Sequence, residues 1–368
     1  MRLTRALLAA SVLAASVHTL TACSAPAADE PPDDPRTVRV ATYNASMNRP
    51  AAGDLVAALR SGTDPQIRSV ADVVQHNAPD MLLLNEFDYS DGAVDLFRDN
   101  YLAVGDAPID YPFAYTAPVN TGEPSGLDLD GDGRSDGPND AWGFGQFPGQ
   151  YGMVVLSKFP LDAAAVRTFQ TFRWADMPDN LLPREYYGAN SDALRLSSKS
   201  HWDVPVDIDG RVIHLLVSHP TPPSFDGPED RNGRRNHDEI RLTADYIAGA
   251  DYLVDDTGLA GGLPNGSSFV VLGDQNSDPV DGDSYPGAIA QLLDSPALQD
   301  PKPTSPTAGT DTADFADPVP GDLRVDYVLP STDLTVKGSG VFWPAPGEPG
   351  AELLSASDHR LVWVDLQV

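Results

Sequence analysis

Residues 267–279 read SSFVVLGDQNSDP, and the abrupt change of character in the middle is informative. Phe269 to Leu272 is apolar enough to form a buried strand, yet it runs directly into Gly273, Asp274, Gln275 and Asn276. A core strand that ends in a carboxylate and a carboxamide puts polar groups at the edge of a sheet, where open α/β sheets bind ligands. The stretch therefore predicts a ligand site, provided that other strands send matching groups to the same edge.

Other segments repeat this pattern. Alternating apolar periods predict strands over 38–43, 81–84, 151–156, 202–208, 211–218, 269–272, 325–329 and 360–366, with helices over 65–77 and 236–253. Polar residues stand at the ends of these strands: Asn44, Glu86, His219, Asp326, Asp358 and His359. Together they supply the oxygen ligands of a hard divalent cation and the acid-base groups of hydrolysis. With no internal repeat and no second linker visible, one α/β domain over 37–368 is favoured.

Seven motifs occur in a fixed order: TYNAS (42–46), LLNEFD (83–88), YGMVVLSKFPL (151–161), VSHPTPP (217–223), GDQN (273–276), RVDYVL (324–329) and SDHRLV (357–362). This order resembles the endonuclease/exonuclease/phosphatase superfamily, which includes pancreatic-type deoxyribonuclease, inositol polyphosphate phosphatases and neutral sphingomyelinases. The resemblance implies a four-layer α-β-β-α sandwich of two mixed β-sheets flanked by helices, with the site at one end of the sheets.

The resemblance also implies roles for single residues. Glu86 would be the principal ligand of a Mg²⁺ or Mn²⁺ ion, assisted by Asn44 and Asp358. Asp274 would orient or activate the attacking water, and Asn276 would hold a phosphate oxygen. His359, kept basic by Asp326, would polarise the nucleophile or contact the phosphoryl oxygens, and His219 would contact the phosphate or assist the leaving group. Taken singly, these residues also fit strand-end caps or a structural ion pair.

The charge balance bears on the substrate. The chain carries 24 Lys and Arg against 54 Asp and Glu, a formal net charge of −30, which disfavours a basic groove that follows a nucleic-acid backbone. We therefore expect a phosphatase or phosphodiesterase acting on phosphate mono- or diesters, whether small or lipid-derived. A nuclease on the same fold and a catalytically silent binding module are the alternatives. No feature indicates a protein partner, and we expect a monomer.

The first 23 residues have the pattern of a targeting segment. A basic start is followed by an apolar run, and LTAC (20–23) places small residues before Cys23, the only cysteine of the chain. This resembles the lipobox of bacterial lipoproteins and predicts a signal peptide over 1–22, lipidation of Cys23 and a flexible tether over 23–36. We expect an exported protein, either held at the cell surface by this lipid anchor or secreted. An ordinary cleaved signal peptide and a retained anchor are the competing interpretations.

Residues 126–140 contain an acidic loop that resembles the start of an EF-hand calcium loop. Asp128, Asp130 and Asp132 alternate, Gly133 takes the sixth position, where a sharp turn is needed, and Asp136 takes the ninth. The twelfth position is Asn139 instead of Glu. The loop predicts a stabilising Ca²⁺ ion, with an acidic solvated loop as the alternative.

The densest cluster of basic residues lies in FDGPEDRNGRRNHDEIRLTADYI (225–247). Because arginine forks suit phosphate, Arg235 and Arg241 are candidates for substrate binding. Pairing with the neighbouring acids is the alternative for both. Lys199, in SSKSHW (197–202), is a further candidate for contact with the substrate.

Overall fold

A computed structural model describes residues 36–368 of the chain. The predicted signal peptide, Cys23 and the tether up to residue 35 lie outside the described residues. Among residues 36–368, no helix is both long enough and apolar enough to cross a membrane.

The first sheet has six strands in the order β12-β13-β1-β2-β4-β3. Their bounds are β1 Thr37–Met47, β2 Met81–Phe87, β3 Phe113–Tyr115, β4 Met153–Ser157, β12 Thr335–Val341 and β13 Val362–Gln367. β1 and β2 are parallel, and the other neighbours are antiparallel. β1 and β2 extend beyond the predicted apolar runs, so Asn44 and Glu86 lie inside strands.

The second sheet has five strands in the order β11-β8-β7-β6-β5. They are β5 Arg167–Thr168, β6 His201–Ile208, β7 Arg211–Ser218, β8 Ser268–Asp274 and β11 Asp326–Pro330, and only β7 and β8 are parallel. Asp209 and Gly210 join β6 to β7 with φ values of 54° and 92°, as the predicted hairpin turn requires. A separate ribbon pairs β9, Ala313–Asp314, with β10, Asp322–Leu323.

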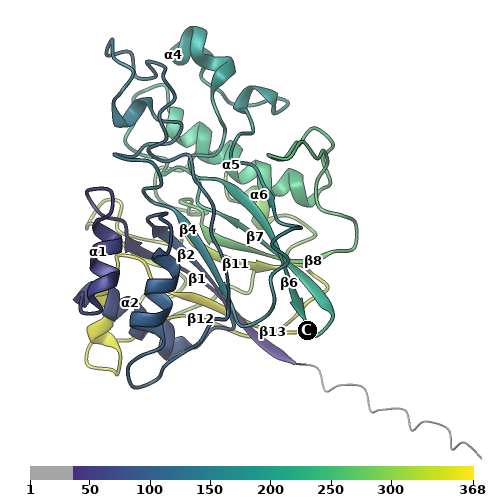
Figure 1. Ribbon diagram of the computed structural model, residues 1–368. Helices are drawn as coiled ribbons and strands as arrows, with labels where there is room; N and C mark the ends of the chain where they lie inside the picture. Colours follow the sequence, from purple (N-terminus) through teal and green to yellow (C-terminus); the bar gives the residue numbers. More distant parts are fainter. Residues whose placement is uncertain (1–35) are drawn as a thin grey trace, which may run out of the picture. The chain divides into compact units, whose positions relative to one another are not determined.

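Helices cover the outer faces of both sheets, and Figure 1 shows the layers. Side chains of α1 Asp54–Ser61, α2 Pro65–Asn77 and α3 Ala93–Phe97 share an apolar cluster with the first sheet. Those of α5 Arg231–Ile247 and α6 Ala290–Leu293 share one with the second sheet. A third cluster fills the space between the sheets, and the short helix α4 spans Arg184–Tyr187. The predicted four-layer sandwich is confirmed.

Helix α5 differs from its prediction, and the physical cause is local. The predicted helix runs over 236–253, but α5 begins at Arg231 and ends at Ile247. Gly249 has a φ of 78°, a left-handed conformation that glycine adopts readily and that closes the helix. The earlier start brings Arg231 onto the first turn of α5, beside the loop that follows β7.

Candidate functional site

The two sheets meet through hydrogen bonds at the edge where the predicted site residues lie. Asn44 Nδ2, on β1, donates to Asp274 Oδ2, on β8, at 3.0 Å. The amide of Asp274 donates to Asn85 Oδ1, on β2, at 3.2 Å. These bonds fix β8 of the second sheet against β1 and β2 of the first. The predicted convergence of strand-end polar groups is therefore a property of the sheet arrangement.

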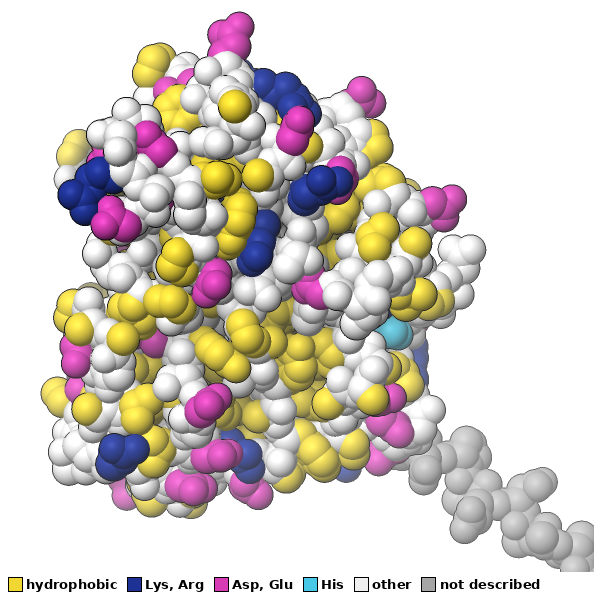
Figure 2. All heavy atoms as spheres, turned by 45° about the horizontal axis from the view of Figure 1, so that its top comes forward, with side chains coloured by type: hydrophobic (Ala, Val, Ile, Leu, Met, Phe, Trp, Pro, Cys, Tyr) yellow, Lys and Arg dark blue, Asp and Glu magenta, His cyan; other side chains and the backbone are white. Residues whose placement is uncertain are grey.

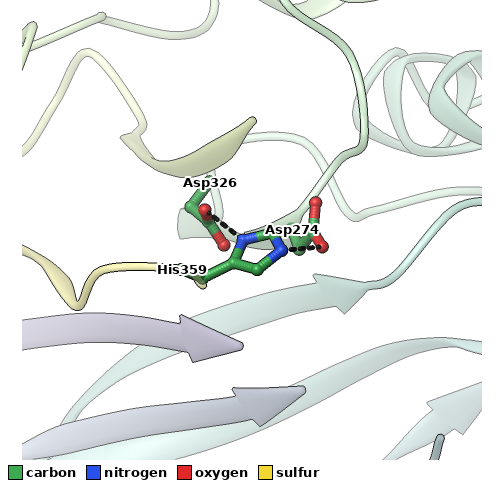
Figure 3. A group of neighbouring side chains, drawn as sticks. All are labelled: Asp274, Asp326 and His359. Carbon is green, nitrogen blue, oxygen red and sulfur yellow. Dashed lines mark hydrogen bonds and ion pairs between the residues drawn. The ribbon is translucent and has the colours of Figure 1, made fainter. Parts of the chain in front are cut away.

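A buried histidine lies between two aspartates at this edge (Figure 3). His359 Nδ1 is 2.8 Å from Asp326 Oδ2, and His359 Nε2 is 3.7 Å from Asp274 Oδ2. Thr312 Oγ1 accepts from the amides of Val325 and Asp326 and donates to Asp326 Oδ2 at 2.9 Å. Asp326 therefore has a fixed orientation, and it fixes the imidazole in turn.

The charges of this group follow from its burial and its neighbours. Burial alone would lower the pKa of His359, but Asp326 and Asp274 outweigh that effect and raise it. Burial raises the pKa of Asp274, an effect that Asp326 adds to and His359 opposes. His359 is accordingly held as a cation at neutral pH, beside a carboxyl group whose affinity for a proton is increased.

His219 lies on the other side of Asp274 and, unlike His359, is neutral. Its Nε2 lies 3.4 Å from Asp274 Oδ2, and its buried Nδ1 has no hydrogen-bond partner among the described residues. Burial, together with the nearby Lys199 and His359, lowers the pKa of His219 well below its ordinary value. His219 is therefore a neutral imidazole that can exchange a single proton.

Asn276 also lies at this edge, in a left-handed turn with a φ of 50°. Its amide N–H donates to Asp274 Oδ1 at 2.9 Å, and its Nδ2 donates to the carbonyl of Pro220 at 3.1 Å. The backbone N–H of Asn276 and the side chain of Asn44 thus hold the two oxygens of Asp274. The predicted contact of Asn276 with a phosphate oxygen stays a prediction.

The donor set predicted for the divalent cation fits such an ion. Burial raises the pKa of Glu86, and although His359, Asn44 and Lys199 oppose that effect, the pKa stays above its ordinary value, so the chain only partly compensates the ionised carboxylate. Asp358 is exposed and accepts from Ser46 Oγ at 3.1 Å, and Glu86 has a φ of 60°. Two carboxylates and the side-chain oxygen of Asn44 are ligands of the kind that Mg²⁺ and Mn²⁺ take, and their joint binding of one ion stays a prediction.

A second arrangement of potential metal ligands overlaps this region. Ligand atoms of Asp274, Asp326 and His359 lie within 4.8 Å of one another. A metal-bound imidazole must give up a ring proton, however, whereas both ring nitrogens of His359 face carboxylates that favour its charged form. This geometry favours proton handling by these three residues, and Glu86, Asn44 and Asp358 as the ligands of the cation stay a prediction.

A cavity of about 560 Å³ opens onto this edge through Glu86 and His219. We call Asn44, Glu86, His219, Asp274, Asp326 and His359 the polar floor. The sides of the cavity come from three segments far apart in the sequence, 121–144, 186–199 and 221–235. We call the five rings that these segments contribute the aromatic wall: Trp142, Phe144, Tyr186, Tyr187 and Phe225.

Helix α5 holds the segments of the cavity together through two buried polar side chains that the sequence prediction missed. The Glu239 carboxylate accepts from the amides of Ser198 and Thr221, both at 2.6 Å. Asn236 Nδ2 donates to the carbonyls of Thr221 and Gln275 at 2.9 and 2.8 Å. The sequence signal was the spacing of Asn236, Glu239 and Thr243, polar residues at helical positions that face the core.

Comparison with known proteins agrees with this geometry. The model of the endonuclease/exonuclease/phosphatase family matches residues 41–359. The chain belongs to this family. Members of the family are metal-dependent hydrolases that act on phosphoesters. No curated protein matches the chain.

Solved structures of the family have the same fold. A family protein from Beutenbergia cavernae DSM 12333 is 19% identical with a TM-score of 0.54, and the match covers 90% of this chain and 72% of that one. A family protein from Bacteroides thetaiotaomicron is 14% identical with a TM-score of 0.51, covering 90% and 98%. One from Leptotrichia buccalis C-1013-b is 13% identical with a TM-score of 0.50, covering 90% and 100%. At these identities the likeness establishes the fold.

The basic residues predicted to bind substrate separate into two groups. Lys199 is buried in the lining of the cavity near Glu86, and burial lowers its pKa. Arg235 also lines the cavity, but its guanidinium donates to the carbonyls of Trp142, Arg195 and Leu196. Arg241 does not line the cavity, since it donates to the carbonyl of Pro178 and pairs with Asp245.

The acidic loop brings together a different set of carboxylates from the one predicted. Ligand atoms of Asp128, Asp130 and Asp140 lie within 4.8 Å of one another and could hold a divalent cation. Asp132 Oδ1 instead accepts from the amide of Arg134, and Asp136 pairs with the Arg134 side chain. Asp140, which sequence reasoning did not include, is buried and accepts from two loop amides. Calcium as the ion stays a prediction.

Proposed function

We propose that this protein hydrolyses phosphate mono- or diesters by attack of water at phosphorus, with Mg²⁺ or Mn²⁺ as its cofactor. The observation that carries the proposal is the geometry of the polar floor: His219 Nε2 and His359 Nε2 lie 3.4 and 3.7 Å from Asp274 Oδ2, and Asp326 Oδ2 holds His359 Nδ1 at 2.8 Å. Family membership supplies the reaction class, and the floor supplies the groups that the reaction needs.

The residues of the floor divide the proton transfers between them. Asp274, whose pKa is raised, takes a proton from the attacking water. As the new bond to phosphorus forms and the bond to the ester oxygen breaks, negative charge develops on the phosphoryl oxygens. His359, held as a cation by Asp326, stabilises that charge. The neutral His219, whose Nε2 lies 3.4 Å from Asp274 Oδ2, relays to the departing oxygen the proton that Asp274 took from the water.

Glu86, Asn44 and Asp358 are the residues that would hold the cation. When bound, the cation acts as a Lewis acid that neutralises charge on the phosphoryl group. Without the cation, the carboxylates of Glu86 and Asp358 would repel an anionic substrate. This electrostatic conflict explains why turnover should depend on the cation.

The acidity of the chain favours compact substrates over nucleic acid. A net charge of −30 repels a polyanion, and Lys199 and Arg235 lie inside the cavity, where they cannot form a continuous track for a nucleic-acid backbone.

We further propose that the protein acts outside the cell, a suggestion that rests on residues 1–23 alone. Cell fractionation of the wild type and Cys23→Ser tests it, because loss of the anchor should release the protein from the membrane fraction.

The test of the chemistry is metal-dependent turnover. The purified protein is stripped of metal, resupplied with Mg²⁺, Mn²⁺ or Ca²⁺, and offered a phosphomonoester, a phosphodiester, a phospholipid and plasmid DNA. We expect turnover of an ester that is lost in Glu86→Gln and His359→Ala and kept in Glu352→Gln, a matched exchange at an exposed acid. A folded protein that hydrolyses none of these would favour the binding module, and cleavage of DNA alone would favour the nuclease.

A further inference from the structure

The aromatic wall has a feature that packing does not explain. Phe225 is 89% exposed, and its φ of 65° lies in the left-handed region, which is strained for a bulky side chain. Phe144, across the same cavity, is 53% exposed. An exposed ring gains little from folding, and glycine would suit this backbone better, so folding alone does not account for phenylalanine at position 225.

Interactions among its side chains keep the rest of the wall in place. Tyr186 and Tyr187 meet edge to face with ring centroids 4.9 Å apart. The Arg231 guanidinium lies over the Tyr186 ring at 5.0 Å and pairs with Glu229. Arg195 lies over Trp142 at 4.8 Å. Trp142, Tyr186 and Tyr187 therefore present ring faces and edges that are already ordered before a ligand arrives, and the exposed rings of Phe144 and Phe225 line the same cavity.

The wall and the polar floor belong to one cavity. Glu86 and His219 line the same space as Trp142 and Phe225, so a group attached to a phosphate at the floor would lie against the rings. Figure 2 shows hydrophobic side chains next to cationic ones on the surface that comes forward from the top of Figure 1. At about 560 Å³, the cavity has room for one or two aromatic rings.

We infer that the substrate is a phosphate ester whose organic group is aromatic, with Phe225 and Tyr186 as specificity-determining residues. The inference rests on the proposed function, since it places the phosphate at the polar floor. Ordered rings favour a flat aromatic group because stacked and edge-to-face contacts add binding free energy beyond that of the apolar area buried. A flexible acyl chain would lose rotamer freedom on binding to these rings, a cost that a rigid aromatic group avoids, and a polymer would meet the repulsion already described.

Binding of phosphonates tests the inference without any chemical step. The dissociation constants of methylphosphonate and phenylphosphonate are measured by calorimetry on the full-length protein supplied with Mg²⁺. We expect phenylphosphonate to bind about tenfold more tightly, the gain from one ring placed against a preformed wall. The two ligands carry the same charged group, so their ratio reports on the wall alone.

Variants of the aromatic wall test whether its rings cause the preference for phenylphosphonate over methylphosphonate. Phe225→Gly removes the ring and relieves the strained φ, so it should fold at least as well as the parent. We expect it to lower the phenyl-to-methyl ratio by about threefold or more, and Tyr186→Ala to do the same. Leu259→Ala is the matched control, because Leu259 is 57% exposed and lies outside the cavity; it should leave the ratio unchanged.

The outcomes separate this inference from the proposed function. Failure of both phosphonates to bind in the presence of Mg²⁺ would remove the support for a phosphate site at the floor, and with it both proposals. Equal binding of the two, with Phe225→Gly behaving as the wild type, would overturn the aromatic substrate alone. Octylphosphonate binding tenfold more tightly than phenylphosphonate would also overturn it, in favour of an acyl chain.

Discussion

The polar floor and the aromatic wall face one cavity but are built in different ways. The floor residues lie on or beside strands of two sheets that are bonded to each other through Asn44 and Asn85. The wall comes from loops and short helical segments whose positions depend on α5. The difference teaches that the reaction and the choice of substrate can vary independently. Rigid strands position the residues of the reaction, whereas loops, which tolerate sequence change, position the rings that select the substrate.

Changing Asp274 should abolish most of the activity of the polar floor and leave ligand binding by the aromatic wall unchanged. In Asp274→Asn the shape and the bond from Asn276 are kept, but the group that takes the proton from water is lost. We expect kcat to fall by about 1,000-fold for any ester that the protein hydrolyses. Steady-state kinetics measures this, and calorimetry should show that phenylphosphonate is still preferred over methylphosphonate.

Asp207→Asn is the control for that change. Asp207 is exposed on β6 and caps the hairpin by accepting from the Gly210 amide at 2.6 Å, a bond that asparagine can also accept. A fall in kcat of less than tenfold in Asp274→Asn would show that another group takes the proton. Loss of the phenyl preference in the same variant would show that floor and wall are coupled.

Thr312 should matter less, because it acts on the substrate only through Asp326 and His359. Thr312→Val removes the hydroxyl that donates to Asp326 Oδ2 at 2.9 Å, and the histidine loses part of its fixed orientation. We expect kcat to fall about tenfold with little change in KM. Thr312→Ser restores the hydroxyl and should recover most of the rate. A serine variant as slow as the valine variant would mean that Thr312 has only a packing role.

The floor could be predicted from the sequence because each of its residues is adjacent to a strong local signal. Glu86 and Asp274 follow apolar runs that can only be buried strands, and parallel pairing of β1 with β2 and of β7 with β8 directs strand ends to a common edge. The family motifs then fixed their order. Thr312 was missed because it lies in a loop with no pattern of its own, and its role exists only through its bond to Asp326.

The wall could not be predicted in the same way. Trp142, Tyr186 and Phe225 lie on segments without a period, and the bonds that place those segments come from distant residues. Glu239, for example, binds the amide of Ser198 across 41 positions. Arg235 was expected at the substrate because of its charge, but nothing in the neighbouring sequence indicates that three backbone carbonyls occupy its guanidinium.

Arg235 therefore provides a test of the wall. If its role is to hold the segments 142 and 195–196 together, Arg235→Met should lower the free energy of unfolding by about 2 kcal/mol, from bonds to a charged donor. Urea denaturation measures this, and the phenyl-to-methyl ratio should fall as the wall loosens. A variant of unchanged stability with a large rise in KM would instead support the original prediction of direct contact with the substrate.

The acidic loop should give the smallest effect, because none of its carboxylates belongs to the polar floor. Ca²⁺ at tenfold above its dissociation constant should raise the melting temperature by about 2 °C. Asp140→Asn and Asp128→Asn should abolish this rise, whereas Asp136→Asn should not, since Asp136 pairs with Arg134 away from the cluster. Differential scanning fluorimetry with and without chelator measures the shift. Loss of the effect in Asp136→Asn but not in Asp140→Asn would show that the ligands follow the EF-hand spacing. No shift in the wild type would show that the loop binds no Ca²⁺ and is an acidic solvated loop.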